Sequence, residues 1–358
     1  MKILFLHPYP AGEAPSQRFR FEQYLDFLEK KGHQIDRQSF LDTKTWRILY
    51  KQGYKFIKII GIIKGFLRRI KLLFSLKKYD YVFIHREATP IGYPFIEYCI
   101  AKICKKKIIF DFDDAIWLPN TSQENKLVAR LKFHQKTNLI CKWATKISAG
   151  NQYLVDYAKQ FNQNVVLNPT TIDTENLHNA DLFPNQKNDI FTIGWTGTHS
   201  TLFYLDFLWE VLEELEQKYT FKMIVIANQK PITTLKSLEF IEWNKNTEIQ
   251  DLLKIDVGLM PLTDDKWAKG KCGFKALQYM ALAIPTIASP VGVNTAIIQN
   301  DENGFLCTTQ QEWKECLISF FENKINYHQI AKNTRQTIVD NFSVIANEEN
   351  FKNLFEKN

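Results

Sequence analysis

The chain has 358 residues, of which 45% are hydrophobic and 24% charged; this is typical of a soluble protein with two globular domains and excludes extensive disorder. Six cysteines form no CxxC pair and no zinc-ligand spacing with histidine, so neither a zinc site nor a disulfide framework is suggested, and a reducing cytoplasm fits best. The net charge of +7 is unevenly distributed: residues 1–180 hold 29 basic and 16 acidic side chains, whereas residues 181–358 hold 17 basic and 23 acidic ones. We therefore expect the first half of the chain to meet an anionic surface.

The first half of the chain alternates short apolar runs with amphipathic stretches. We expect strands at Ile3–Leu6, Tyr81–His85 and Ile108–Phe112, and helices at Arg20–Lys31, Pro94–Lys105 and Asn125–Trp143. This order predicts a parallel sheet with helices on both faces. The apolar run at the N-terminus is too short for a secretory signal. The loop at residues 7–18 has one glycine and lacks GxGxxG, so a nicotinamide dinucleotide site is disfavoured.

The segment Thr43–Tyr79 contains no acidic residue, while lysines and arginines interleave with Trp, Ile, Leu and Phe. Basic side chains recur at helical spacing, and Gly61 and Gly65 interrupt the apolar positions between them. The longest uncharged run is far shorter than the roughly 20 residues that a spanning helix needs. We expect this segment to lie on an anionic membrane surface. A solvated helix packed on the first domain is the alternative, and nucleic acid is disfavoured because no nucleic-acid module accompanies the charge.

Three carboxylates, Asp111, Asp113 and Asp114, lie at the carboxyl end of the strand expected at Ile108–Phe112. Asp111 and Asp113 share one side of the strand because side chains alternate with period two. An acidic group there can bind hydroxyl groups or accept a proton. The same residues form an aspartate-x-aspartate pattern, which can hold a divalent metal on a diphosphate. A helix-capping role is the structural alternative for Asp114.

The second half repeats the architecture of the first. The turn at residues 168–173 and the polar stretch Thr174–Asn188 separate the two parts. We then expect strands at Ile190–Trp195, Lys222–Ala227 and Val257–Met260, with helices at Leu202–Lys218 and Ile249–Lys254.

A glycine-bearing turn follows the first strand of this second half. Turns of this kind face a ligand at the carboxyl edge of a parallel sheet. Gly194 and Gly197 permit close backbone approach, Thr198 or Ser200 can cap the next helix, and His199 can donate to a phosphate or a hydroxyl group. The candidate ligand contacts are Gly194, Thr196, Gly197, Thr198 and His199. A plain cap and turn is the structural alternative.

The loop Lys269–Lys275 is basic, contains two glycines and opens a helix expected at Ala276–Leu282. Gly273 and Phe274 lie where backbone N–H groups begin the helix, and Lys271 and Lys275 add positive charge. A helix N-terminus with cations beside it is a suitable site for a diphosphate. A solvated lysine-rich turn is the alternative.

The order of these parts, with Met280-Ala281 and Pro285 after the basic loop, resembles GT-B glycosyltransferases, in particular the large retaining group called family four. The resemblance covers nearly the whole chain. It implies an α/β protein of GT-B fold, with two Rossmann-like domains facing across a cleft and a C-terminal helix crossing back. The implied first domain is 1–173 with 343–358, followed by a linker at 174–188 and a nucleotide-sugar domain at 189–342.

The family carries two glutamates eight residues apart, and here Gly270 and Gln278 occupy those positions, so the acidic pair is absent. Gln278 can still hydrogen-bond a ribose hydroxyl. The resemblance places donor-phosphate contacts in the glycine turn and the nucleobase near Trp243.

On the acceptor side, the resemblance places Asp113 where many members have a histidine that faces the transferred sugar. It also makes Arg18, Arg20 and His85 candidates for acceptor contacts.

We therefore expect a glycosyltransferase that moves a sugar from a nucleotide-diphosphate donor to a glycan or lipid-linked acceptor in envelope or capsule polysaccharide synthesis. The resemblance implies a retaining reaction without a metal and with no cofactor beyond the nucleotide sugar; Asp113, Lys271 and Lys275 are the candidate catalytic residues. We expect a cytoplasmic protein, peripheral on the inner face of the cell membrane. Two alternatives stay open: a catalytically silent nucleotide-sugar or membrane-binding partner, and a metal-dependent transferase that uses Asp111 and Asp113.

Overall fold

The computed structural model describes residues 1–49, 51, 53–119, 133–184 and 189–356. The chain forms two compact units. Unit 1 comprises Met1–Thr170 together with Glu348–Asn358, and unit 2 comprises Thr171–Asn347. Part of the helix expected at Asn125–Trp143 and the end of the expected linker lie outside the described residues.

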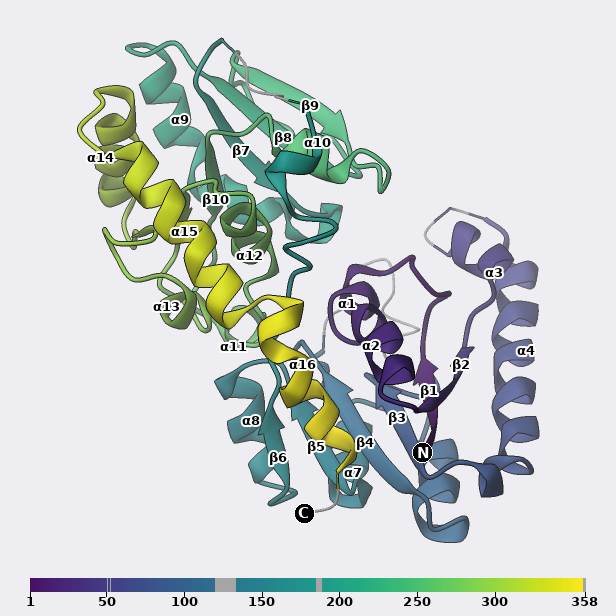
Figure 1. Ribbon diagram of the computed structural model, residues 1–358. Helices are drawn as coiled ribbons and strands as arrows, with labels where there is room; N and C mark the ends of the chain where they lie inside the picture. Colours follow the sequence, from purple (N-terminus) through teal and green to yellow (C-terminus); the bar gives the residue numbers. More distant parts are fainter. Residues whose placement is uncertain (50, 52, 120–132, 185–188, 357–358) are drawn as a thin grey trace. The chain divides into compact units, whose positions relative to one another are not determined.

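Unit 1 is built on a parallel six-stranded sheet in the order β2-β1-β3-β4-β5-β6 (Figure 1). Its strands are β1 (Lys2–His7), β2 (Gln34–Ser39), β3 (Tyr81–His85), β4 (Lys107–Phe112), β5 (Lys146–Ala149) and β6 (Val165–Leu167). The central strands β1, β3 and β4 are almost wholly buried, as expected for a parallel sheet covered on both faces. The edge strand β2 was not expected, because its sequence QIDRQS is polar and its side chains are half-buried or exposed.

Short helices and one long helix connect these strands. They are α1 (Pro15–Arg18), η1 (Glu22–Tyr24), α2 (Leu25–Lys30), α3 (Thr43–Ile48), α4 (Lys55–Leu73), η2 (Leu76–Lys78), α5 (Phe95–Tyr98), η3 (Cys99–Ile103), α7 (Lys136–Trp143) and α8 (Gln152–Lys159). The single helix expected at Arg20–Lys31 is wrong in its first part, since the chain turns there and regular helix begins only at Leu25. The helix expected at Pro94–Lys105 is an α-helical turn that continues as a π-helix.

Helix α4 is continuous over 19 residues and runs beside the edge strand β2 (Figure 1). Its glycines do not break it. A Cβ on Gly61 would lie 2.1 Å from Thr45 Oγ1, and a Cβ on Gly65 would lie 2.8 Å from the carbonyl oxygen of Phe40. The two glycines therefore form the face on which α4 packs closely against unit 1. Among the helices that the structure describes, none is both long enough and apolar enough to cross a membrane.

The end of the chain belongs to the core of unit 1. Helix α16 (Val344–Lys352) and the turn η7 (Asn353–Phe355) bring Phe351 and Phe355 inside, where each is at most 1% exposed. Phe351 stacks on Tyr24 with ring centroids 4.3 Å apart, and Phe355 packs on Phe5 at 6.0 Å. The crossing back of the C-terminal helical segment to the first half of the chain is thus confirmed.

Unit 2 has a second parallel six-stranded sheet, in the order β12-β11-β10-β7-β8-β9 (Figure 1). Its strands are β7 (Thr192–Thr196), β8 (Lys222–Ala227), β9 (Leu238–Glu242), β10 (Val257–Met260), β11 (Thr286–Ala288) and β12 (Phe305–Leu306). Its helices are η5 (Ala180–Leu182), η6 (His199–Phe207), α9 (Trp209–Glu216), α10 (Glu248–Leu252), α11 (Lys266–Lys269), α12 (Phe274–Ala281), α13 (Asn294–Ile297), α14 (Gln310–Phe321) and α15 (Tyr327–Asn341). The helix expected at Leu202–Lys218 begins as the 3-10 helix η6 and becomes α-helical only at Trp209.

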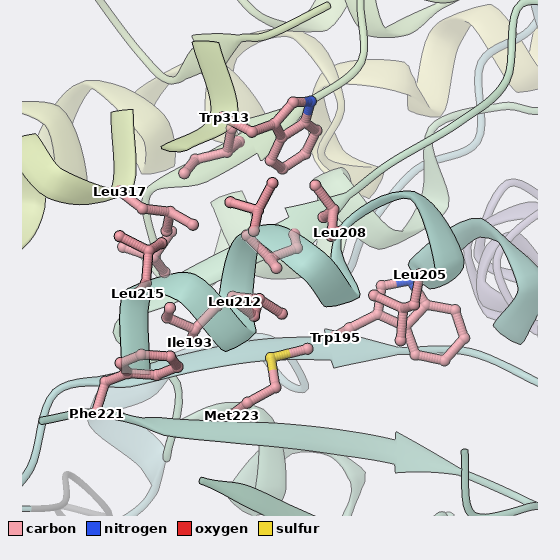
Figure 2. Close-up of a cluster of buried hydrophobic side chains, with 14 of the residues drawn as sticks. Ile193, Trp195, Leu205, Leu208, Leu212, Leu215, Phe221, Met223, Trp313 and Leu317 are labelled. Carbon is pink, nitrogen blue, oxygen red and sulfur yellow. The ribbon is translucent and has the colours of Figure 1, made fainter. Parts of the chain in front are cut away.

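A large apolar core covers one face of this sheet (Figure 2). Leu205 of η6, Leu208 between η6 and α9, and Leu212 of α9 are 0% exposed and lie over the sheet that carries Trp195 of β7. Trp313 and Leu317 of α14 close the cluster from the other side (Figure 2), and the Trp313 indole N–H donates to the Cys307 carbonyl at 2.9 Å. This core fixes the end of β7, from which the glycine turn leaves.

Candidate functional site

The N-terminus of α12 in unit 2 is the centre of the expected diphosphate site. Gly273 caps this helix in the left-handed region, with φ of 70°, and a Cβ there would lie 2.4 Å from Ile297 Cδ1. Conformation and space both require glycine at this position. The helix begins at Phe274, two residues before the start expected from the sequence.

Aromatic rings surround the two lysines of this site. The Lys271 ammonium lies 5.5 Å from the centroid of the Trp267 ring and 6.0 Å from that of Tyr204. The Lys275 ammonium lies 5.2 Å from the centroid of Trp195. Each such contact stabilises the cation by about 0.5–1 kcal/mol at a partly exposed site. The rings thus restrict two long side chains that would otherwise sample many rotamers. The third lysine of the loop, Lys269, pairs instead with Asp264 at 2.8 Å.

The glycine turn after β7 lies beside α12 within unit 2. The backbone N–H of Thr196 donates to the Tyr279 hydroxyl of α12 at 2.8 Å. Tyr279 is 0% exposed, and burial raises the pKa of its hydroxyl. A Cβ on Gly197 would lie 2.3 Å from the Trp195 ring, so glycine is needed for the turn to pass this indole. The structure therefore brings the turn and the basic loop, which are distant in the sequence, to one edge of the sheet.

The other expected donor contacts in this turn differ in their surroundings. Gly194 is buried in the strand, where a Cβ would lie 2.2 Å from Ile255 Cδ1, so the structure gives it a packing role. Thr198 is the N-cap of η6, and its N–H donates to Thr201 Oγ1 at 3.2 Å. His199 is exposed, and its N–H donates to Asn228 Oδ1 at 2.7 Å. Sequence reasoning missed Asn228, which follows the last residue of β8.

Two expected nucleoside contacts already have partners inside unit 2. Gln278 is 5% exposed, and its Nε2 lies 3.3 Å from Nε2 of the buried His178. Trp243 is half-buried, and its backbone N–H donates to the Ala227 carbonyl at 3.0 Å. Its side chain packs against the apolar cluster that contains Tyr279. A ribose hydroxyl would therefore meet a Gln278 side chain that is almost buried and already in contact with His178.

In unit 1, Arg20 and His85 converge on Asp111 rather than on the surface. The carboxylate accepts from Arg20 Nη2 at 2.5 Å, from His85 Nδ1–H at 2.7 Å and from Ser148 Oγ at 2.6 Å. The Arg20, His85 and Asp111 side chains are 0% exposed. Burial opposes ionisation of Asp111, but the Arg20 charge and the His85 hydrogen bond outweigh it and hold the pKa below its usual range. Arg20 is therefore a buried side chain of unit 1, fixed on Asp111.

Asp113 is held by a neighbour that the sequence did not single out as its partner. Arg86 Nε donates to Asp113 Oδ1 at 2.8 Å, and Arg86 Nη2 lies 2.7 Å from the same oxygen. Arg86 adopts a left-handed conformation with φ of 60°, which is strained for a side chain of this size. Burial lowers the pKa of Arg86, but the carboxylates of Asp113 and Asp114 overcome this and raise it.

The remaining acceptor-side candidate is Arg18 in α1. Its guanidinium lies 5.0 Å from the centroid of the Phe19 ring, and the residue is half-buried. It therefore retains contact with solvent, unlike Arg20. Within the described residues, no cluster of three or more His, Cys, Asp or Glu side chains is arranged to hold a metal ion.

Comparison with known proteins agrees with the fold described above. Residues 206–337 match the family model described as Glycosyl transferases group 1. A glycosyltransferase from Rickettsia africae ESF-5 superposes with a TM-score of 0.70 at 14% identity, covering 99% of this chain and 97% of that one. Anabaena Alr3699/HepE in complex with UDP-glucose gives 0.65 at 15% identity, with 98% of each chain covered. The lipopolysaccharide outer core galactosyltransferase WaaB gives 0.61 at 14% identity and 99% coverage of both chains. No curated protein sequence matches the chain. These likenesses show the GT-B fold.

Proposed function

We propose that the chain, a glycosyltransferase of GT-B fold with a group 1 domain, moves a sugar from a nucleoside diphosphate donor held by unit 2 to a glycan or lipid-linked acceptor held by unit 1. The observation that carries the proposal is the pair of ring-restrained lysines, Lys271 and Lys275, at the glycine-capped start of α12. Two ammonium groups and a helix N-terminus match the charge of a diphosphate.

Electrostatic stabilisation of the leaving diphosphate is the main contribution we assign to the protein. The negative charge on the leaving group grows as the bond to the sugar breaks, so groups fixed in advance stabilise the transition state more than the ground state. In a retaining reaction the donor's own diphosphate takes the proton of the acceptor hydroxyl, so no protein group needs to titrate there. Asp113, oriented by Arg86, would bind a sugar hydroxyl of the donor or acceptor.

UDP is the first nucleotide to test, because the similar HepE structures contain UDP or UDP-glucose. Envelope or capsule polysaccharide synthesis is the setting we propose, in keeping with the likeness to a lipopolysaccharide galactosyltransferase.

We place the protein on the inner face of the cell membrane, held there by the segment 43–79. The observation that favours this is the outer face of α4, where Phe56 is 83% exposed, Leu67 is 60% exposed and several isoleucines are about half exposed. Lys55, Lys64 and Lys71 are exposed on the same helix, and the whole segment lacks acidic residues. Apolar area with flanking lysines fits an anionic leaflet. Arg69 does not contribute to this face, since it is 0% exposed and donates to the carbonyls of Ala88 and His7 at 2.9 and 3.0 Å.

A catalytically silent nucleotide-sugar-binding protein is the second candidate. It is favoured by the absence of the family's two glutamates and by the contact of Gln278 with His178. The metal-dependent alternative is disfavoured, because the Asp111 carboxylate already accepts from Arg20, His85 and Ser148.

Titration calorimetry with UDP and UDP-glucose tests the donor site on three proteins: the wild type, the Lys271→Ala/Lys275→Ala variant and a Lys269→Ala control. Loss of two charge-assisted contacts should weaken UDP binding by about a hundredfold or more. The control should bind like the wild type, because Lys269 pairs with Asp264 in the same loop. If neither UDP nor any other nucleoside diphosphate binds the wild type, the proposal is wrong. Binding of the sugar nucleotide with no release of UDP in the presence of membrane acceptors would favour the silent protein instead.

A further inference from the structure

A second group of exposed apolar side chains lies on unit 1, outside the segment 43–79. Tyr93 is 51% exposed, Phe95 56%, Tyr98 38% and Ile103 64%. These four residues, which we call the aromatic patch, lie within eleven positions of one another, in the loop before α5, in α5 and in the π-helix η3. Single exposed apolar residues are common on protein surfaces, but a cluster of this kind indicates a binding surface.

The two tyrosine rings of the aromatic patch pack against other aromatic rings of unit 1. The Trp143 ring of α7 lies 5.4 Å from Tyr98 and 6.2 Å from Tyr93 between ring centroids. Phe133 lies 5.8 Å from Tyr93. The patch is thus a supported surface, and little conformational entropy is lost when it becomes covered.

The charges around the aromatic patch are positive. Lys102 and Lys105 are exposed in the same stretch of chain. The one acidic residue of the described segment 91–107 is Glu97, which is 0% exposed and accepts from the Ala88 N–H at 2.9 Å. The outer surface of this segment therefore combines aromatic rings with ammonium groups and carries no carboxylate.

The aromatic patch adjoins the helix that we propose lies on the membrane. Helices α4 and α5 contact each other within unit 1. Lys106, directly after the patch, donates to the carbonyls of Lys77 and Tyr79 at 3.0 and 2.7 Å, which fixes this stretch against the residues that follow α4. The two surfaces are therefore parts of one compact unit.

We propose that the aromatic patch is a second membrane anchor, which enters the headgroup region of an anionic leaflet beside α4. The proposal rests on the membrane association in the proposed function and names a contact outside the segment 43–79. Tyrosine and tryptophan favour the boundary between headgroups and acyl chains, where one end of the ring is apolar and the other hydrated. The lysines complement the negative charge of the leaflet.

A second anchor has a consequence for orientation. One amphipathic helix on a surface leaves rotation about the helix axis weakly restrained, whereas two contacts on different elements restrain it. The aromatic patch would therefore fix which way the carboxyl edge of the unit 1 sheet, with Asp113 and Arg86, is turned relative to the lipid.

Vesicle co-sedimentation of the full chain tests this proposal, with phosphatidylcholine vesicles and with vesicles that also contain phosphatidylglycerol. The patch variant is Phe95→Ser/Ile103→Ser, the helix variant is Phe56→Ser/Leu67→Ser, and the control is Leu182→Ser/Ile232→Ser, which removes two exposed apolar side chains from unit 2. The patch variant and the helix variant should each partition about tenfold more weakly than the wild type, given the apolar area that each removes. The control should be unchanged.

A second patch variant, Lys102→Glu/Lys105→Glu, alters only exposed side chains and should lose binding to the anionic vesicles selectively.

The outcomes separate the two proposals. If the helix variant loses binding while both patch variants bind like the wild type, the second anchor is wrong and the membrane association stands. If the wild type binds no vesicles at all, the membrane part of the proposed function fails together with the anchor. If the patch variants keep vesicle binding but turn a dimer into a monomer by light scattering, the aromatic patch is a contact between copies of the chain and the anchor is overturned. Melting temperatures and UDP affinity of every variant should match the wild type.

Discussion

At the scale of single residues, unit 1 places several polar and charged side chains where water cannot reach them. Arg20, His85 and Asp111 form one hydrogen-bonded group, and each of their side chains is 0% exposed. In such a group the removal of one partner leaves a buried charge uncompensated and typically costs about 3–5 kcal/mol of stability. With Ser148, which donates to Asp111, the group holds together the carboxyl ends of β3, β4 and β5. The partly buried pair of Arg86 and Asp113 lies next to this framework in the chain.

His7 supplies a prediction about pH. Burial, together with the nearby positive charge of Arg69, lowers the pKa of His7 to about 4. The Tyr9 carbonyl, which accepts from the His7 Nδ1–H at 2.7 Å, acts in the opposite direction and raises this pKa. Above pH about 6.5 the imidazole is neutral in the folded and the unfolded chain. As the pH falls from 6.5 toward 4, only the unfolded chain takes up the proton, so stability decreases. Between pH 7 and 5 this one group should lower the free energy of unfolding by about 2 kcal/mol.

Equilibrium urea unfolding at pH 7 and pH 5 measures that decrease. The His7→Gln variant should lack it, while a His328→Gln control, altered at an exposed position, should keep it. Equal pH dependence in the wild type and in His7→Gln would contradict the assignment.

At the scale of elements, α4 shows how one helix serves two environments. Its inner face carries Gly61, Gly65 and the buried Arg69, and its outer face carries Phe56, Leu67 and exposed isoleucines. The sequence pattern indicates an amphipathic helix but not which face is inside, because glycine and arginine are unusual contacts with a protein core. The small glycines are what allow the helix backbone to approach Phe40 and Thr45.

Gly65→Ala tests this close contact. Alanine in a helix interior normally stabilises by about 1 kcal/mol relative to glycine. Here the added Cβ would meet the backbone oxygen of Phe40 at 2.8 Å and the Phe40 ring at 2.7 Å, so we expect a net destabilisation of about 1–3 kcal/mol. Ile63→Ala, on the exposed face of the same helix, is the matched control and should change stability by less than about 0.5 kcal/mol. Urea unfolding provides the comparison, and a stabilised Gly65→Ala protein would show that α4 is not closely packed.

At the scale of the whole molecule, the two units share an architecture but not a continuous stretch of chain. Unit 1 is completed by Glu348–Asn358, whose aromatic side chains reach the core beneath β1 and β3. The unit that begins the chain therefore cannot bury its core fully until the last residues are present. Unit 2, in contrast, is built from one continuous segment.

Phe351→Ala tests this dependence. The ring is 0% exposed and stacks on Tyr24, so its removal should destabilise unit 1 by about 3–5 kcal/mol through the cavity that it leaves. Phe74→Ala, which alters an 86% exposed ring of the same unit, should change stability by less than about 0.5 kcal/mol. Hydrogen exchange locates the effect: amides of β1 and β3 should lose protection in Phe351→Ala, while those of β7 and β8 should not. Equal loss of protection in both units would mean that they unfold as one.

Local signals in the sequence were enough to predict much of the fold. Apolar runs separated by amphipathic stretches predicted both parallel sheets, and the bounds expected for Lys222–Ala227 and Val257–Met260 are those of β8 and β10. The polar edge strand β2 escaped prediction because an edge strand needs little apolar surface. The basic loop at Lys269–Lys275 stood out since glycines, lysines and a following helix are neighbours in the chain.

The sequence by itself thus determined the α/β class, the division into two sheets and the position of the loop proposed to bind diphosphate, because each depends on residues close together along the chain. Only the tertiary structure decided that Arg20 lies on Asp111, 91 residues away, and that Gln278 lies on His178, 100 residues away. It also decided that Thr196 is tied to Tyr279 and that aromatic rings restrain Lys271 and Lys275. Such contacts leave no periodic pattern in the sequence, since the partners become neighbours only when sheets and helices pack.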